Sequence, residues 1–255
     1  MVTVGTCGYS RYDATEGWKD DYESKLAAFA DAYESVELQS TFYELPQVST
    51  AERWRREAGE EFTFALKAWQ AVTHPSSSPT WNNHRDALPE GDVGYFKDSE
   101  AVRDAWDATL DRADALDADV VVLQTSPSFG PTEEHESNLR EFFDDVDRRG
   151  YTIAWEPRDE WKDDPDRVAD VCEGLDLVHV VNPLHRDPVD DAAVAYCRMH
   201  GETGDIHDYD YRYEDDELDD LADCLQELDA DDVYVMFNNT HMFEDATRLR
   251  ERLAD

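Results

Sequence analysis

Side chains that could transfer protons or stabilise charge stand directly after short apolar runs in this sequence of 255 residues. Four of them carry the predicted chemistry: Glu37, Lys67, Glu156 and His200. The glutamates could act as general acid or base, and an imidazole suits the same work because it titrates near neutral pH. Lys67 is one of only five lysines, so its position could require a compact charge or an amine that forms a Schiff base. We predict these four as catalytic residues.

Further polar and aromatic residues near the same runs are predicted to bind a substrate. They are Arg158, Arg198, Gln124, Asn238, Asn239, Tyr43, Trp161 and His74. The arginines could clamp a phosphate or carboxylate, or they could instead neutralise the two glutamates. The asparagines could bind hydroxyl groups or cap a helix, and the aromatic rings could line a pocket or belong to the core. Each of these residues therefore has a structural interpretation beside its functional one.

A metal site is an alternative use of the same carboxylates and imidazoles. Glu37, His74, Glu156 and His200 provide the oxygen and nitrogen ligands that Mn, Zn or Mg accept in proteins. No HExxH motif or other tight ligand spacing supports that arrangement. We therefore predict no cofactor and no metal ligand, and keep a divalent metal as an open alternative.

The apolar runs recur along the chain and predict eight β-strands. Their ranges are Val2–Thr6, Ser35–Leu38, Phe62–Leu66, Val120–Leu123, Thr152–Trp155, Leu177–Val181, Val194–Met199 and Val233–Phe237. Several are continuously apolar, which is typical of strands buried on both faces. Amphipathic segments between them predict helices at Tyr22–Ala32, Glu100–Ala115, Thr132–Arg149, Pro165–Gly174, Asp215–Glu227 and Glu244–Leu253.

Strands that alternate with helices over this length are typical of a TIM-like (β/α)8 barrel, an α/β fold whose chemistry lies on the loops that follow the strands. The polar residues above close the predicted strands, so this fold would gather them at one end. A doubly wound open sheet is the rival, but the sequence has no GxGxxG opening. We expect a single domain over residues 1–255, with a long irregular loop at about 74–94 after the third strand.

The chain carries 62 acidic and 23 basic side chains, a formal net charge of −39. This charge argues against nucleic acid and against an anionic membrane surface as partners. We interpret the carboxylate-rich, lysine-poor composition as adaptation to a high-salt cytoplasm, with a surface that meets a basic partner as the alternative. The four cysteines show no paired spacing, no signal peptide is apparent, and no apolar run reaches the length of a membrane span. We expect a cytoplasmic protein.

Several of these segments resemble the YecE-like family, catalogued as domain of unknown function seventy-two. The matching segments are Gly5–Tyr9, Val36–Pro46, Phe62–Lys67, Thr73–His74, Leu123–Gln124, Pro127–Phe129, Glu156–Arg158 with Trp161, Arg198–Gly201 and Phe237–Asn239. The resemblance spans nearly the whole chain and implies a TIM-like barrel with a polar pocket at its carboxyl end, but no reaction. The sequence departs from the family pattern at Cys7, Tyr9 and Gln39, where Ser, Trp and Asn are usual, which argues against a nucleophilic Cys7.

These observations favour an enzyme that uses acid/base chemistry on a small anionic or polyhydroxylated molecule. A sugar or sugar phosphate is the expected substrate, and a hydrolase, isomerase or lyase the expected class. A non-catalytic ligand-binding or scaffold barrel is the first alternative, because the same charges could form a buried ion-pair network. A metal-dependent phosphoester or nucleic-acid enzyme is the second.

Overall fold

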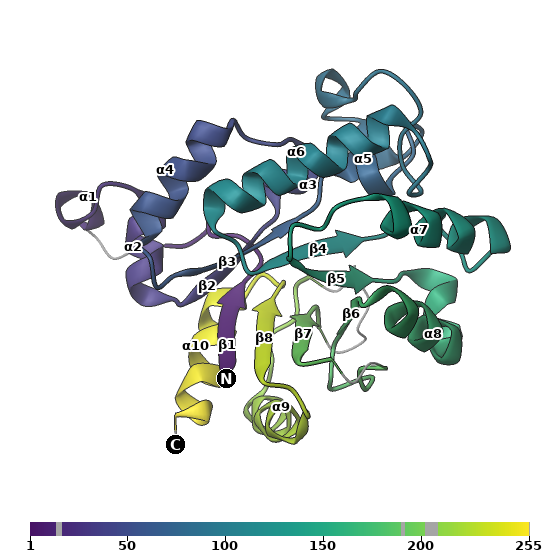
Figure 1. The fold of residues 1–255 in the computed structure, drawn as a ribbon. Helices are drawn as coiled ribbons and strands as arrows, with labels where there is room; N and C mark the ends of the chain where they lie inside the picture. Colours follow the sequence, from purple (N-terminus) through teal and green to yellow (C-terminus); the bar gives the residue numbers. More distant parts are fainter. Residues whose placement is uncertain (14–16, 190–191, 202–208, 255) are drawn as a thin grey trace. The chain divides into compact units, whose positions relative to one another are not determined.

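Eight parallel strands form a closed barrel and follow one another around it in the order of the sequence (Figure 1). The computed structural model describes residues 1–13, 17–189, 192–201 and 209–254. The strands are β1 (Val2–Thr6), β2 (Ser35–Leu38), β3 (Thr63–Lys67), β4 (Val120–Gln124), β5 (Thr152–Glu156), β6 (Val178–Val181), β7 (Val194–Met199) and β8 (Asp232–Phe237). Each strand agrees with a predicted run to within one residue at either end, and the predicted barrel class is confirmed. The extent of the single domain, residues 1–255, stays a prediction.

Helices and short 3-10 turns connect the strands. The helices are α1 (Trp18–Asp21), α2 (Lys25–Ala32), α3 (Ser40–Tyr43), α4 (Val48–Ala58), α5 (Gln70–Thr73), α6 (Glu100–Leu116), α7 (Glu133–Asp145), α8 (Pro165–Leu175), α9 (Asp215–Glu227) and α10 (Met242–Leu253), and the turns are η1 (Pro79–Trp81), η2 (Arg85–Ala87) and η3 (Asp159–Asp163). The prediction did not include α4, although Val48, Ala51, Trp54 and Ala58 recur in it at helical spacing. None of the helices in the described part of the chain is long and apolar enough to cross a membrane.

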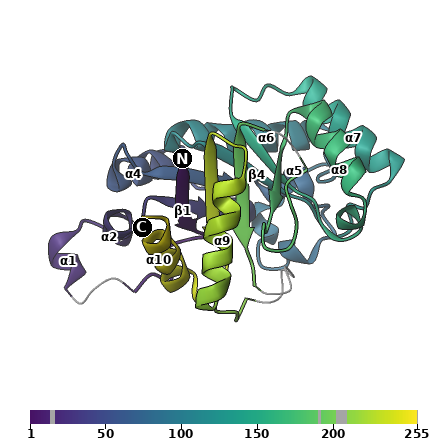
Figure 2. The same ribbon diagram turned by 90° about the horizontal axis from the view of Figure 1, so that it is seen from below.

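The chain divides into two compact units, and the first holds Met1–Glu37, Trp54–Phe64 and Val180–Asp255. In this unit β1, β8 and β7 lie side by side, and both outer strands pair their last residue, Thr6 or Met199, with Phe237 of β8 (Figure 1). The residues that follow β7 and β8 therefore begin next to each other. Figure 2 shows α9 and α10, which pack against one another along this part of the sheet.

The second unit holds Leu38–Arg53 and Ala65–His179. Its strand β4 lies between β3 and β5, pairing Val122 with Lys67 and Gln124 with Glu156 (Figure 1). Lys67, Gln124 and Glu156 are the last residues of their parallel strands. Since parallel strands end at the same edge of a sheet, all three residues lie at one edge of this unit.

The loop predicted at about 74–94 contains η1 and η2, and its C-terminal end is hydrogen-bonded to α5. The backbone N–H of Gly94 donates to the carbonyl of Ala71 over 2.8 Å, and that of Phe96 donates to Val72 over 3.0 Å. Gly94 has a φ of +82°, and a Cβ there would lie 2.2 Å from the carbonyl carbon of His74. Only glycine fits such a backbone and such a close approach, so the loop packs directly on the backbone of His74 and fixes its place.

Candidate functional site

Lys67, at the end of β3, has its ammonium group held between an amide oxygen and an aromatic ring. Its Nζ donates to Oε1 of Gln124 over 2.6 Å and lies 4.3 Å from the centroid of the Phe42 ring. The residue is only 5 % exposed. The hydroxyl of Thr41 donates to the Lys67 carbonyl over 2.7 Å and so ties α3 to the end of the strand. The amide oxygen of Gln124 and the ring of Phe42 both favour a positive charge at this position.

Arg158 lies two residues beyond Glu156, the last residue of β5, and forms an ion pair with it. Nη2 of Arg158 is 2.9 Å from Oε1 of Glu156, and the two side chains are 3 % and 9 % exposed. Nε and Nη1 of Arg158 are also buried, but neither has a hydrogen-bond partner within the described ranges. Since both nitrogens carry only donors, the site contains buried N–H groups that lack an acceptor.

His74 is a buried, neutral imidazole in the same unit. Its Nδ1 lies 2.8 Å from the hydroxyl of Thr73, and its ring meets the Phe42 ring edge-on at 4.9 Å. Burial, followed by the positive charges of Lys67 and Arg158, lowers the pKa of His74 from 6.5 to about 3. A neutral imidazole offers one donor and one acceptor. We name Lys67, His74, Gln124, Glu156 and Arg158 the Lys67–Arg158 cluster.

The first unit contains a second buried ion pair, at the ends of β2 and β7. Oε1 of Glu37 lies 3.1 Å from Nη2 of Arg198, and the side chains are 0 % and 1 % exposed. The hydroxyl of Tyr196 donates to Oε2 of Glu37 over 2.8 Å, and Nη2 of Arg198 donates to Sγ of Cys7 over 3.7 Å. Burial and then the charge of Glu37 raise the pKa of Tyr196 well above its usual value, so the phenol keeps its proton. We name these four residues the Glu37–Arg198 cluster.

His200 and Asn238 follow β7 and β8 and meet as the strand register requires. Nδ2 of Asn238 lies 3.2 Å from Nδ1 of His200. An amide nitrogen can only donate, so Nδ1 accepts, and a neutral His200 carries its proton on Nε2. Asn239 points elsewhere: its Nδ2 donates to the carbonyl of Tyr211 and to Oδ2 of Asp245, each over 2.7 Å.

Two of the predicted aromatic residues differ sharply in exposure. Tyr43 is 40 % exposed and stacks on His84 with ring centroids 5.0 Å apart. Trp161 is fully buried, donates from Nε1 to the carbonyl of Phe129 over 2.7 Å, and meets Trp155 edge-on. Trp161 thus packs inside the second unit, as its structural interpretation had it. Substrate contact by either residue stays a prediction.

Each predicted arginine neutralises a predicted glutamate, which was one of the two alternatives open for it. Arg158 pairs with Glu156 and Arg198 with Glu37. Only those guanidinium N–H groups that the glutamates do not occupy could then bind an anion. In the second unit, the structure also brings Lys67 onto Gln124, as their places at the ends of neighbouring strands indicated.

Two residues of the site were missed in the sequence. Tyr196 stands two residues before Arg198 on β7, and the two-residue period of a strand puts both on one face, which could have revealed it. Asp245 is fully buried in α10 and accepts from Asn239 and from Nη1 of Arg248. Burial raises the pKa of Asp245. Nothing in the sequence separates it from the other acidic residues of a charged helix.

The alternative of a metal site was tested on the arrangement of possible ligands. Within the described residues, no group of three or more His, Cys, Asp and Glu side chains is placed to hold a metal ion. Of the four residues considered for that alternative, Glu37 and His200 belong to the first unit and His74 and Glu156 to the second.

A family model described as protein of unknown function DUF72 matches residues 3–255. Among curated proteins, the UPF0759 protein YunF of Bacillus subtilis (strain 168) is 26 % identical over 141 residues, which cover 55 % of this chain and 45 % of YunF. The aligned segment thus spans less than half of that relative.

Solved structures of two DUF72 proteins are similar over the whole chain. EF0366 of Enterococcus faecalis V583 matches with a TM-score of 0.74 and 19 % identity, covering 100 % of this chain and 96 % of that one. TM1631 of Thermotoga maritima MSB8 matches with a TM-score of 0.72 and 20 % identity, covering 100 % of both chains. At these identities the likeness shows the fold alone.

Proposed function

The chain belongs to the DUF72 family, whose description gives no function, and from its buried clusters we propose that it is an enzyme that moves protons on a small substrate. The substrate is anionic or polyhydroxylated, of the sugar or sugar phosphate class, and the reaction is a hydrolysis, an isomerisation or a lyase cleavage. Glu156 and Lys67 of the second unit and Glu37 and His200 of the first are the catalytic residues.

The observation that carries the proposal is the buried charge of the Lys67–Arg158 cluster. Taking an ion out of water costs several kcal/mol, and the cost is offset only when its hydrogen bonds are complete. Arg158 is buried with two donor nitrogens for which the described residues provide no acceptor, so stability alone does not account for the cluster. It also stands at the carboxyl ends of barrel strands, where barrel enzymes hold their reacting groups.

The roles follow from the contacts. Glu156 forms an ion pair with the Arg158 guanidinium and begins the reaction as the proton acceptor. The Lys67 ammonium and the neutral His74 can stabilise an oxygen on which negative charge develops. His200, with its proton on Nε2, acts as a donor, and Glu37 is oriented by Tyr196 and Arg198.

The remaining predicted residues hold the substrate. Asn238 and Asn239 bind its hydroxyl groups, and Gln124, Tyr43 and Trp161 complete the set together with the two arginines and His74. Oδ1 of Asn239 supports this role, because it is buried and has no donor within the described part of the chain. A hydroxyl group is the natural donor for such an oxygen.

Proton transfer can be tested without knowing the product. The protein is incubated in D2O with a panel of sugars, sugar phosphates and sugar acids, and NMR follows both deuterium uptake beside carbonyl groups and bond cleavage. We expect one member of the panel to react, and Glu156→Gln to lower the rate by roughly 10²- to 10⁴-fold.

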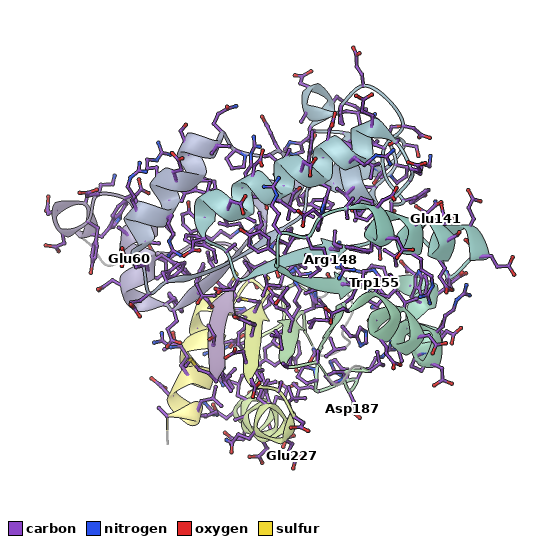
Figure 3. All side chains as sticks on the ribbon, viewed as in Figure 1. Glu60, Glu141, Arg148, Trp155, Asp187 and Glu227 are labelled. Atoms are coloured by element: carbon purple, nitrogen blue, oxygen red, sulfur yellow. The ribbon has the colours of Figure 1, made fainter. Side chains whose placement is uncertain are left out.

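Glu141→Gln is the matched control. Glu141 is an exposed carboxylate of α7 that projects outward and accepts a hydrogen bond from the hydroxyl of Ser137 (Figure 3). Its variant should react at the wild-type rate. If Glu156→Gln is folded and reacts as fast as the wild type, Glu156 is not the proton acceptor.

A non-catalytic binding or scaffold protein is the alternative. The two buried ion pairs support it, because a buried network of charges can hold a fold together without taking part in a reaction. Under this alternative Glu156→Gln unfolds the protein or weakens it strongly, and no member of the panel exchanges or breaks. A stable variant that loses turnover excludes it.

We further propose that the protein works in a high-salt cytoplasm, without a cofactor and without nucleic acid or membrane as partner. The net charge of −39 supports this, because a carboxylate-rich surface repels itself until salt screens it. The free energy of unfolding should rise as KCl is raised from low to molar concentration. A flat or falling dependence on KCl would contradict salt adaptation.

A further inference from the structure

The Lys67–Arg158 cluster has more positive than negative charge and more donors than acceptors. Lys67 and Arg158 are cations, Glu156 is the one carboxylate, and His74 is neutral because the pKa of its imidazole is about 3. Glu156 satisfies Nη2 of Arg158, and no described residue satisfies Nε or Nη1. The side chain of Arg158 is 3 % exposed, so bulk water is not freely available to these two nitrogens.

We infer that Nε and Nη1 of Arg158, together with the Lys67 ammonium, bind an anionic oxygen group of the substrate, a phosphoryl group or a carboxylate. This inference rests on the proposed function and names the chemical class of its substrate. A bound oxyanion would supply the missing acceptors and offset the excess positive charge in the same step.

A neutral ligand would satisfy the donors less well. A hydroxyl oxygen could accept from one of the two nitrogens, but it carries no negative charge to set against the guanidinium. Guanidinium groups bind phosphate and carboxylate through several N–H donors at once, and such charge-assisted bonds are roughly twice as strong as neutral ones. The planar ring of Phe42 below Lys67 further confines the ammonium to the cluster.

Glu156 has a double effect on this site, which makes it the key to the test. It is the proposed proton acceptor, and it also occupies one donor of Arg158 and contributes the only negative charge of the cluster. Removing its charge should therefore lower turnover by roughly 10²- to 10⁴-fold and yet leave anion binding equal or tighter. The two proposals then fail or succeed on separate readouts.

The experiment is calorimetric titration of the full chain with inorganic phosphate, and separately with acetate, at constant KCl and pH. We expect saturable binding of one anion per chain to the wild type and equal or tighter binding to Glu156→Gln. The double variant Glu156→Gln/Arg158→Gln should bind about 10- to 100-fold more weakly than Glu156→Gln. Glu156→Gln leaves the Arg158 guanidinium buried without its carboxylate, whereas the double variant removes both charges, so circular dichroism and urea unfolding must show that each protein is folded before it is titrated. If Glu156→Gln does not fold, the wild type and the double variant are compared, and equal binding by these two overturns the inference.

Arg103→Gln is the matched control, because it removes one positive charge from the same unit at an exposed arginine of α6 that pairs with Asp98. It should bind as the wild type does. Tighter binding of phosphate than acetate identifies a phosphoryl group, and the reverse order identifies a carboxylate.

The inference is overturned if neither anion binds, or if the double variant binds as tightly as Glu156→Gln. A chain that binds phosphate through Arg158 but turns over no substrate keeps the anion site and refutes the acid/base chemistry. A chain that turns over a neutral sugar and binds neither anion keeps the acid/base chemistry and refutes the anion site.

Discussion

His74 should make the protein lose stability on mild acidification, and the size of the loss follows from its surroundings. The imidazole is 2 % exposed, and burial together with Lys67 and Arg158 holds its pKa at about 3. In the unfolded chain it regains an ordinary value near 6.5. Because the folded pKa is the lower one, the unfolded chain takes up the proton first, and the stability present above about pH 6.5 is lost as the pH falls towards 3.

The loss can be worked out for two convenient conditions. With a folded pKa of about 3 and an unfolded pKa of about 6.5, lowering the pH from about 7 to about 5 costs about 2 kcal/mol of unfolding free energy through His74 alone. The many carboxylates of the chain titrate as well, so the useful quantity is the difference between the wild type and a variant without the imidazole. His74→Asn keeps a polar atom near Thr73 and removes the titrating ring.

The assay is urea unfolding at the two pH values, at constant KCl. His74→Asn should lose about 2 kcal/mol less than the wild type between them, whatever the substitution costs at neutral pH. Thr73→Val should retain the full wild-type loss, because it removes a neighbour of the ring and neither its burial nor the cations. Equal losses for the wild type and His74→Asn would refute the placement of a neutral imidazole between two cations.

Three further substitutions test contacts inside the first unit or inside the second. Arg198→Met should cost about 3 to 5 kcal/mol in urea unfolding because it leaves Glu37 buried without its cation, and the double variant Glu37→Gln/Arg198→Met should recover most of that loss. Gly94→Ala should lower the free energy of unfolding by at least about 1 to 3 kcal/mol, since its φ is +82° and the new Cβ meets backbone 2.2 Å away; an unchanged midpoint would mean that the loop shifts freely. Asp245→Ala should cost about 1 to 3 kcal/mol by leaving the Asn239 amide short of an acceptor, and a thermal unfolding curve like that of the wild type would show that the amide finds another.

The strands and their polar ends could be predicted because both depend on local sequence. A buried parallel strand is a short apolar run, and the polar residue that closes it marks the point where the chain leaves the sheet. Lys67, Gln124 and Glu156 were found in this way, and β3, β4 and β5 end at them. The register pairs Lys67 with Val122, and the Lys67 ammonium reaches Gln124 two residues further along β4.

The partners of the charged groups could not be predicted, because they depend on packing between distant segments. The Glu37–Arg198 pair joins residues far apart in the chain, and the sequence left both a clamp and an ion pair open for the arginine. Asp245 is one acidic residue among 62, and only the packing of α10 shows that this one is buried. Helix α4 is a different case, because its apolar residues recur at helical spacing and the sequence pattern alone could have revealed it.

The net charge and the local charge of this protein describe different properties. Acidic side chains such as Glu60, Glu141, Asp187 and Glu227 are exposed, where salt screens them within about 8 Å at physiological ionic strength (Figure 3). Lys67 and Arg158 are buried, and buried charges are screened far less. The surface charge therefore slows the approach of an anion, while the affinity depends on the donors that it meets inside. Added salt should then assist an anion in reaching this protein, the reverse of its effect on proteins that attract anions with a basic surface.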